Sequence, residues 1–221
     1  MIRLERQLPS GQRAQVRFTD RGDGDFAPAS PRVDDRRRRL APHPWTWLRQ
    51  VHGADVITVV SPGEGAGTEA DAAATSSPGA VLSVCTADCA PVVLLGASGV
   101  GAAHAGWRGT LEGVLDAAVA AVRAIDPGPV QAVVGPCIRP THYEFGPDDL
   151  DRMADRFGPG VRARTADDRP ALDLGAAVVA SLTPVVDEVV DLGHDTADDR
   201  WFSNRVRAEA ARQVAAVWVE R

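Results

Sequence analysis

Cysteine is scarce in this chain of 221 residues, which contains only Cys85, Cys89 and Cys137. An odd, low cysteine count in a chain of this length argues against a disulfide framework and is typical of a reducing compartment. The first residues, Met1 to Arg6, lack the apolar core of a secretory signal, and no apolar run is long enough to span a bilayer. We therefore expect a cytoplasmic protein that does not bind membranes, with thiols free for metal binding or catalysis.

An excess of positive charge is absent too, because 24 basic residues face 30 acidic ones and the net charge is -6. Proteins that bind nucleic acid through bulk electrostatics carry the opposite sign, so no nucleic-acid partner is expected. The one basic block, Arg36 to Arg39, follows Asp34 and Asp35 in a proline-rich stretch, and its charge is partly cancelled. This pattern predicts a solvated loop, with an arm that binds anions or nucleotides as the alternative.

No internal repeat or linker divides the chain, and its length suits one domain, so residues 1–221 are predicted to form a single domain. Short apolar runs at 80–86, 92–95 and 100–103 are typical of buried strands. Strand-like pairs are mixed with a few helices, and there is no regular alternation of strand and helix. The order predicts an α+β fold, a layered sandwich with mixed β-sheets.

The clearest helical pattern covers residues 110–125, where apolar side chains recur at helical spacing. Thr110 is a suitable N-cap for this helix. Two stretches, 20–44 and 61–79, are rich in proline, glycine and polar residues and are predicted to be loops.

Three residues from separate segments, His52, Cys89 and His104, suggest a metal site. Imidazole nitrogen and thiolate sulfur are preferred ligands of zinc and copper, and three protein ligands with an open fourth position are typical of catalytic zinc. Their spacing matches no local metal motif, however. From spacing alone, a buried thiol with two hydrogen-bonded histidines is the favoured alternative.

A second group of residues opens the predicted helix, where Arg108 stands between Gly106 and Thr110. Helix N-termini expose unpaired N–H groups, and a guanidinium suits phosphate or carboxylate. The segment lacks the Gly-Lys-Ser/Thr of a P-loop. A simple strand-to-helix turn with a surface arginine is the alternative.

Three more residues carry chemistry that the sequence leaves open. Cys137 follows a Gly-Pro pair and is either a nucleophile or a packed thiol, and Asp88 is an acid/base, a partner of a metal-bound histidine or a turn former. Asp71 either lines a pocket or caps a turn, with capping favoured. A cysteine hydrolase that uses Cys89 or Cys137 with His104 and Asp88 is an alternative to a metal site. The two functions compete for Cys89, because one thiolate does not easily act as a metal ligand and as a nucleophile.

Four segments together resemble one known family. They are RQVHGADV at 49–56, TADCAPV at 86–92, AHAGWRG at 103–109 and GPCI at 135–138. They are similar, in this order, to signatures of the bacterial YfiH-type polyphenol oxidase or laccase-domain family, whose members act as purine nucleoside phosphorylases.

The resemblance implies a layered α/β sandwich and a metal, zinc or alternatively copper, bound by His52, Cys89 and His104. It implies phosphorolysis of adenosine, inosine, guanosine or methylthioadenosine, with adenosine deamination alongside. Asp88, Arg108 and Cys137 are then the candidate catalytic residues, with Arg108 positioning phosphate. The partners are purine nucleosides and phosphate, and the oligomeric state is left open, a monomer being compatible.

Two further functions are alternatives to a purine nucleoside phosphorylase. A copper-dependent polyphenol oxidase, the older assignment of the family, fits less well because one site with three ligands cannot supply several copper centres. A protein that binds a metal or a nucleotide without turnover is a further alternative. The C-terminal part departs from the family pattern: Asp195-Thr196 replaces a Cys-Thr pair, residues 201–205 replace an aromatic and basic segment, and a Thr-Gly-Arg is missing. Substrate contacts from that region are therefore open.

Overall fold

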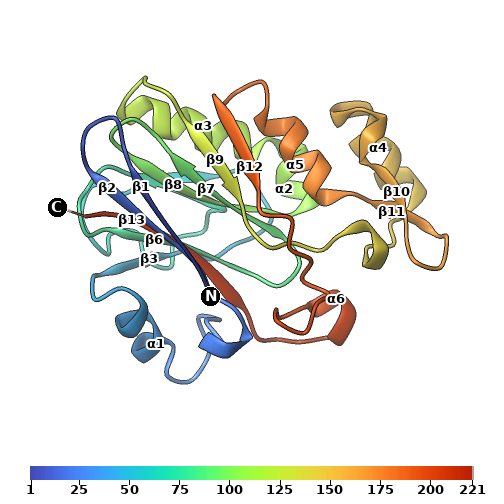
Figure 1. Cartoon of the computed structure of the whole chain (residues 1–221), viewed down its shortest axis with the longest axis horizontal. Coiled ribbons are helices and arrows are strands. Elements are labelled where there is room, and N and C mark those ends of the chain that lie inside the picture. The colour runs from blue at the N-terminus through green and yellow to red at the C-terminus, as the bar shows by residue number, and fades with distance from the viewer. Residues whose placement is uncertain (221) are drawn as a thin grey trace.

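Two mixed β-sheets stack face to face between layers of helices in this computed structural model, which describes residues 1–220 (Figure 1). The five-stranded sheet has the order β1-β2-β13-β6-β3. Its strands are β1 (Ile2–Gln7), β2 (Arg13–Phe18), β13 (Gln213–Glu220), β6 (Val81–Thr86) and β3 (Trp45–Trp47). Adjacent strands in this sheet are antiparallel, except β3 and β6, which are parallel to each other.

The six-stranded sheet has the order β12-β9-β7-β8-β5-β4. Its strands are β12 (Glu188–Asp191), β9 (Gln131–Val134), β7 (Ala90–Leu95), β8 (Val100–Ala105), β5 (Ala72–Thr75) and β4 (Val56–Thr58). The outer pairs β12–β9 and β4–β5 are parallel and the inner pairs are antiparallel. A separate hairpin consists of β10 (Arg162–Arg164) and β11 (Pro170–Leu172).

Three helices pack on the outer face of the six-stranded sheet: α2 (Trp107–Glu112), α3 (Val114–Ile125) and α5 (Leu174–Leu182). Helix α4 (Pro147–Phe157) packs against α2, α5 and the hairpin strand β11. Helix α1 (Val33–Leu40) lies beside the five-stranded sheet, and the short α6 (Asn204–Arg207) precedes β13. None of these helices is long and apolar enough to cross a membrane.

Burial follows these layers. Side chains such as Val16, Val84 and Val93 fill the space between the two sheets. On the other face of the six-stranded sheet, Val92 and Leu94 pack with Leu115 of α3. The layered α/β sandwich with mixed sheets, predicted from the order of elements, is confirmed.

Four local predictions were wrong. The helix begins at Trp107 and is interrupted at Gly113, whose left-handed φ of 97° separates α2 from α3. Thr110 therefore lies inside α2, where its hydroxyl donates to the Gly106 carbonyl, and Gly106 is the N-cap. The stretch 20–44 contains α1, and the stretch 61–79 contains β5.

Candidate metal centre and active-site pocket

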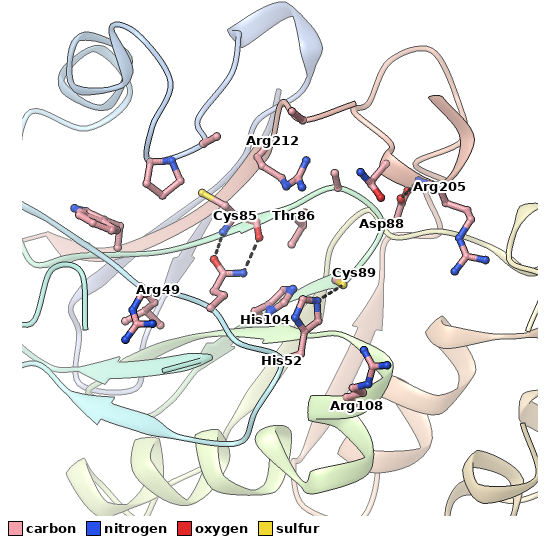
Figure 2. Close-up of a pocket in the computed structure, with 18 of the residues that line it drawn as sticks. Arg49, His52, Cys85, Thr86, Asp88, Cys89, His104, Arg108, Arg205 and Arg212 are labelled. Carbon is pink, nitrogen blue, oxygen red and sulfur yellow. Dashed lines mark hydrogen bonds between the residues drawn. The ribbon is translucent and has the colours of Figure 1, made fainter. Parts of the chain in front are cut away.

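His52, Cys89 and His104 meet at one end of the sandwich (Figure 2). His52 lies in the turn between β3 and β4, Cys89 in the turn between β6 and β7, and His104 within β8. One nitrogen or sulfur atom from each residue lies within 4.8 Å of the others, and the His52 Nε2 to Cys89 Sγ distance is 3.8 Å. The three donors are therefore close enough to share one ion, which is compatible with the metal site that the resemblance implied.

A fully buried carboxylate, that of Asp71, positions both histidines. It contacts His104 Nδ1 at 2.7 Å and accepts hydrogen bonds from the backbone N–H groups of Val51, His52 and Gly53 at 2.9–3.0 Å. His52 has a left-handed φ of 63°, a costly conformation for histidine that these bonds hold in place. Because Nδ1 is engaged, Nε2 is the nitrogen that His104 offers to a metal, an arrangement common at metal-bound histidines.

Two glycines let the chain close around this centre. A Cβ on Gly106 would lie 2.8 Å from Cδ2 of His52 and 3.1 Å from Sγ of Cys89. A Cβ on Gly109 would lie 2.8 Å from the carbonyl oxygen of Gly53. The segment AHAGWRG therefore carries glycine where α2 passes against the His52 turn.

The electrostatics favour a thiolate at Cys89. Burial raises the pKa of this thiol, but the charge of His104 and hydrogen bonds from both histidines outweigh burial and lower it. Burial lowers the pKa of His104, but the Cys89 thiolate and Asp71 raise it above its usual value. The thiolate is the form of cysteine that binds metals.

A pocket of about 840 Å³ opens over the three residues. Four arginines line it: Arg49, Arg108, Arg205 and Arg212. Arg49 is paired with Glu69. Among residues 1–220, the other three have no carboxylate within ion-pairing distance, so the pocket is suited to an anionic ligand.

Asp88 is the only acidic residue that residues 1–220 contribute to the pocket lining, and its carboxylate is already engaged. Oδ1 accepts hydrogen bonds from the hydroxyls of Thr196 (2.8 Å) and Ser203 (2.6 Å), and Oδ2 accepts from the backbone N–H of Arg205 (2.6 Å). Its φ of 98° is unusual for a residue other than glycine. These bonds tie the TADC turn to the C-terminal segment, including Thr196 of the divergent Asp195-Thr196 pair.

Aromatic rings support two of the arginines. The guanidinium of Arg108, in the first turn of α2, lies 4.6 Å from the ring centroid of Trp107. That of Arg205 lies 4.8 Å from the ring of Tyr143, a buried residue that sequence reasoning missed. Stacking against rings limits the motion of both guanidiniums at the pocket wall. The Thr86 hydroxyl, also in the lining, is buried and has no hydrogen-bond partner within the described chain.

Cys137 is not brought to the pocket. It is fully buried in the core beside the six-stranded sheet, and burial raises the pKa of its thiol to about 12. Its backbone connects other parts of the site: the Cys137 carbonyl accepts from Thr196 N–H, and the next residue, Ile138, donates its N–H to the Asp88 carbonyl. The GPCI turn therefore supports the loop that carries Asp88 and Cys89.

The site residues that were not predicted from the sequence come mostly from chain segments distant from the motifs. Arg212, the residue before β13, lines the pocket, although no role was predicted for it. Gln50, within the RQVHG motif, exchanges two hydrogen bonds with the backbone of Cys85 and so fixes the start of the His52 turn. Only the RQVHG motif itself could have drawn attention to Gln50.

Residues 29–220 match the family described as Multi-copper polyphenol oxidoreductase laccase. The chain belongs to this family. A protein named purine nucleoside phosphorylase from Xylella fastidiosa (strain Temecula1) is 38% identical over 187 residues, which cover 78% of this chain and 71% of that protein. The Escherichia coli K12 protein named purine nucleoside phosphorylase YfiH is 43% identical over 122 residues, covering 52% and 49% of the two chains.

Solved structures share the fold. A Neisseria meningitidis protein of the DUF152 family superposes with a TM-score of 0.82 over 100% of this chain and 99% of its own, at 23% identity. YlmD from Geobacillus stearothermophilus gives a TM-score of 0.78 and 25% identity over 96% and 94% of the chains. The resemblance inferred from the four motifs is confirmed, and the names of the relatives support an enzyme of the phosphorylase kind.

Proposed function

We propose that this chain is a purine nucleoside phosphorylase that cleaves adenosine, inosine, guanosine or methylthioadenosine with phosphate. The observation that carries the proposal is the convergence of His52, Cys89 and His104 beneath a pocket with three unpaired arginines. A pocket of about 840 Å³ is within the range of small-molecule sites. The names of the relatives support the same reaction.

The three donors fit a metal ion, with zinc proposed and copper as the alternative. Two imidazoles and one thiolate form a donor set that suits both ions. Asp71 holds both histidines in place, and the lowered pKa of Cys89 favours the ligating thiolate. When bound at a site with an open position, zinc acts as a Lewis acid and lowers the pKa of water.

In phosphorolysis, a phosphate oxygen forms a bond to the anomeric carbon of the sugar while the bond from that carbon to the purine nitrogen breaks. The base leaves with the electron pair and takes up a proton, and the sugar leaves as its 1-phosphate. Arg108 is proposed to hold the phosphate, because its guanidinium is exposed at the pocket and has no carboxylate partner within residues 1–220. Holding two reactants side by side supplies much of the rate enhancement in such a step.

Asp88 is proposed to position the C-terminal segment that places Arg205 at the pocket wall. The acid/base role that the sequence suggested stays a prediction, and the contacts favour another role. All the hydrogen bonds described for its carboxylate hold Thr196, Ser203 and Arg205. Through the backbone of Arg205, this carboxylate places a guanidinium beside Tyr143 at the pocket wall.

Adenosine deamination is proposed as a side activity of the same site. It replaces the amino group of the purine with oxygen from water and releases ammonia, which requires proton transfer. Within the described part of the chain, Asp88 is the only carboxylate in the lining, and it is engaged elsewhere, so we expect this activity to be slower than phosphorolysis.

The product assay tests the proposal directly. Purified protein is incubated with inosine in the presence or absence of phosphate, and the products are separated by chromatography. Hypoxanthine and ribose 1-phosphate are expected only with phosphate. Failure to release base from any of the four nucleosides would remove the phosphorylase assignment. Elemental analysis of the same sample is expected to give about one zinc per chain, lost in His52→Ala and Cys89→Ala.

A second function is favoured by one observation, the 3.8 Å contact between the Cys89 sulfur and the His52 ring. A thiolate beside a histidine is the basis of cysteine hydrolases. The two functions differ in metal dependence: a hydrolase would keep its activity after chelation and lose it on alkylation of Cys89.

The family name also keeps copper-dependent phenol oxidation open to test, by oxygen uptake after copper loading. Within residues 1–220, the structure brings together a single cluster of three or more metal-binding side chains.

A further inference from the structure

A second, smaller pocket of about 290 Å³ is lined by residues of α1, β1 and β2 and by Met1. Its lining includes Arg3, Arg17, Arg36 and Arg39 together with the apolar side chains of Phe26 and Leu40. None of these six residues lines the large pocket. Four guanidiniums around one small cavity are unexpected in a chain whose net charge is -6.

Two of these arginines are neighbours on adjacent strands of the sheet. Arg3 of β1 and Arg17 of β2 are directly opposite in the antiparallel register, where like charges destabilise a sheet. Burial and the charge of Arg3 both lower the pKa of Arg17. Arg17 is nonetheless held in place, since it donates to the Leu4 and Val16 carbonyls and stacks 5.2 Å from the Trp218 ring.

The other two arginines come from the basic block, which is helical and divides into two pairs. Arg37 and Arg38 each pair with an aspartate three residues earlier, Asp34 and Asp35. Arg36 and Arg39, also three residues apart and so on one side of α1, line the pocket. Arg36 donates to the carbonyls of Asp25 and Pro31.

Among residues 1–220, no carboxylate lies within 4.0 Å of these four guanidiniums, although the charges of Glu5 and Glu220 act on Arg17 and that of Asp25 acts on Arg36. Asp23, the acidic residue of the lining, accepts from the Asp20 N–H and lies 3.4 Å from the N-terminal ammonium. Asp25 accepts from the N–H groups of Ala27 and Arg212.

Arginines with and without a carboxylate partner are also separated along the described chain. Most arginines in residues 1–220 have an aspartate or glutamate within 4.0 Å. Those without one gather at the two pockets, apart from Arg6, Arg13 and Arg32. The small pocket therefore shares with the proposed active site an excess of unpaired guanidinium groups.

We propose that the small pocket binds a phosphate-bearing small molecule. Guanidiniums match phosphate oxygens with paired N–H donors, and all 24 basic residues of the chain are arginines. Phosphate would offset the repulsion between Arg3 and Arg17 and would complete the hydrogen bonding of Arg36 and Arg39. Phe26 and Leu40 supply apolar surface for an organic part, so a sugar phosphate or nucleotide fits the lining as well as free phosphate does.

Binding is tested by calorimetry at low ionic strength with three probes: inorganic phosphate, diphosphate and ribose 5-phosphate. Because the large pocket is also expected to take phosphate, two variants of one helix are compared. Arg39→Gln removes a positive charge from the small pocket, and Arg38→Gln removes the same charge from the neighbouring exposed residue that pairs with Asp35.

We expect Arg39→Gln and Arg3→Gln to weaken one class of site about tenfold or more for at least one probe, the size expected for a lost charge-assisted hydrogen bond. Arg38→Gln should stay within about twofold of the parent, given how little exposed pairs contribute. Phosphorolysis of inosine should be unchanged in all three variants, which separates this site from the proposed active site. Equal binding in Arg39→Gln and Arg38→Gln, or no binding of any probe, would overturn the proposal.

A second measurement separates a binding role from a structural one. Without ligand at low salt, Arg3→Gln is expected to raise the melting temperature, because it removes a like-charge pair, and the rise should shrink at high salt. The variant should also show a smaller probe-induced increase in melting temperature than the parent protein, because only the large pocket still binds the probe at full strength. A probe-induced increase as large in both Arg3→Gln and Arg39→Gln as in the parent contradicts the proposal.

Discussion

The Asp71 carboxylate contacts Nδ1 of His104 at 2.7 Å and, through the same oxygen, accepts the backbone N–H of His52 at 3.0 Å. One buried side chain thus sets the ring orientation of one histidine and the backbone of another, although the two come from different segments. Partners of this kind raise the affinity of metal-binding histidines and fix their geometry.

Replacing Asp71 with asparagine should therefore loosen the metal centre. The amide keeps one acceptor oxygen, but its NH₂ group faces backbone donors where the carboxylate had an acceptor. We expect zinc affinity to fall roughly 10- to 100-fold, as for other partners of metal-bound histidines. Competition with a chelator measures the affinity, and circular dichroism checks the fold.

Asp55→Asn is the matched control, since Asp55 lies in the same turn region with an exposed side chain. It should bind zinc like the parent. Parental affinity in Asp71→Asn as well would contradict the role given to Asp71.

Gly106→Ala is expected to disrupt the site by steric contact alone. The backbone φ of Gly106 is -76°, which alanine adopts without strain, so any effect comes from the added Cβ against His52 and Cys89. We expect a loss of activity on the order of 100-fold, as for small displacements of reacting groups, with the fold retained. Steady-state rates with inosine and phosphate provide the measurement.

Gly146→Ala offers a close comparison. Gly146 is also the N-cap of a helix, with φ -66°, and a Cβ there would meet nothing within 4 Å. Parental activity is expected. Similar losses in both variants would point to a general effect of alanine at the N-cap and against the contact with the metal centre.

Asp88→Asn separates positioning from acid/base chemistry. Asparagine tolerates the left-handed backbone but weakens the bonds to Thr196, Ser203 and Arg205. A positioning role predicts that KM rises about tenfold, with a smaller change in kcat and an unchanged pH profile. Loss of one limb of the pH profile together with a collapse of kcat would instead establish Asp88 as the acid or base.

The predictable parts of the fold are those whose burial leaves a periodic pattern. Strands β6 and β7 were recognised because β-branched and large apolar residues dominate them, and β8 because the apolar run Val100–Ala103 begins it. Strand β5 was missed because its sequence is Ala-Ala-Ala-Thr, and alanine is uncommon in strands; it is buried between β4 and β8, where small side chains fit. Helix α1 was missed because its charges suggested a solvated loop, whereas Asp34 and Asp35 pair with arginines one turn later.

The candidate metal-site residues were suggested by their residue types and then by the resemblance, not by their spacing. Separations of 37 residues from His52 to Cys89 and 15 from Cys89 to His104 contain no local signal, because the fold alone brings these segments together. The role of Asp71 was hidden for the same reason: its partners lie 18 to 33 residues away, so capping of a local turn was the favoured interpretation. Contacts made across the sandwich leave no periodic pattern in one sequence.

Metal removal should expose one reactive thiol. Cys85 and Cys137 have thiol pKa values raised to about 12 by burial, whereas Cys89 lies at the pocket beside two histidines. In protein stripped of metal, iodoacetamide at neutral pH should label Cys89 first, as read by peptide mass spectrometry. Adding zinc back before the reagent should protect it; labelling at an undiminished rate with zinc present would argue against Cys89 as a ligand.

Glu209 is expected to contribute to stability above the acid range. A hydrogen bond from Arg21 lowers the pKa of this carboxyl to about 2, with further bonds from the Ser203 N–H and Arg207. Because the folded-state pKa lies below the unfolded value of about 4.3, the contribution is fully present above that value and is lost as pH falls toward 2. Glu209→Gln should therefore lower the melting temperature at pH 7 and flatten its decline between about pH 5 and pH 2. Glu112→Gln, at an exposed residue of α2, should reproduce the parental curve, and the same steep decline in Glu209→Gln would mean that other carboxylates govern acid unfolding.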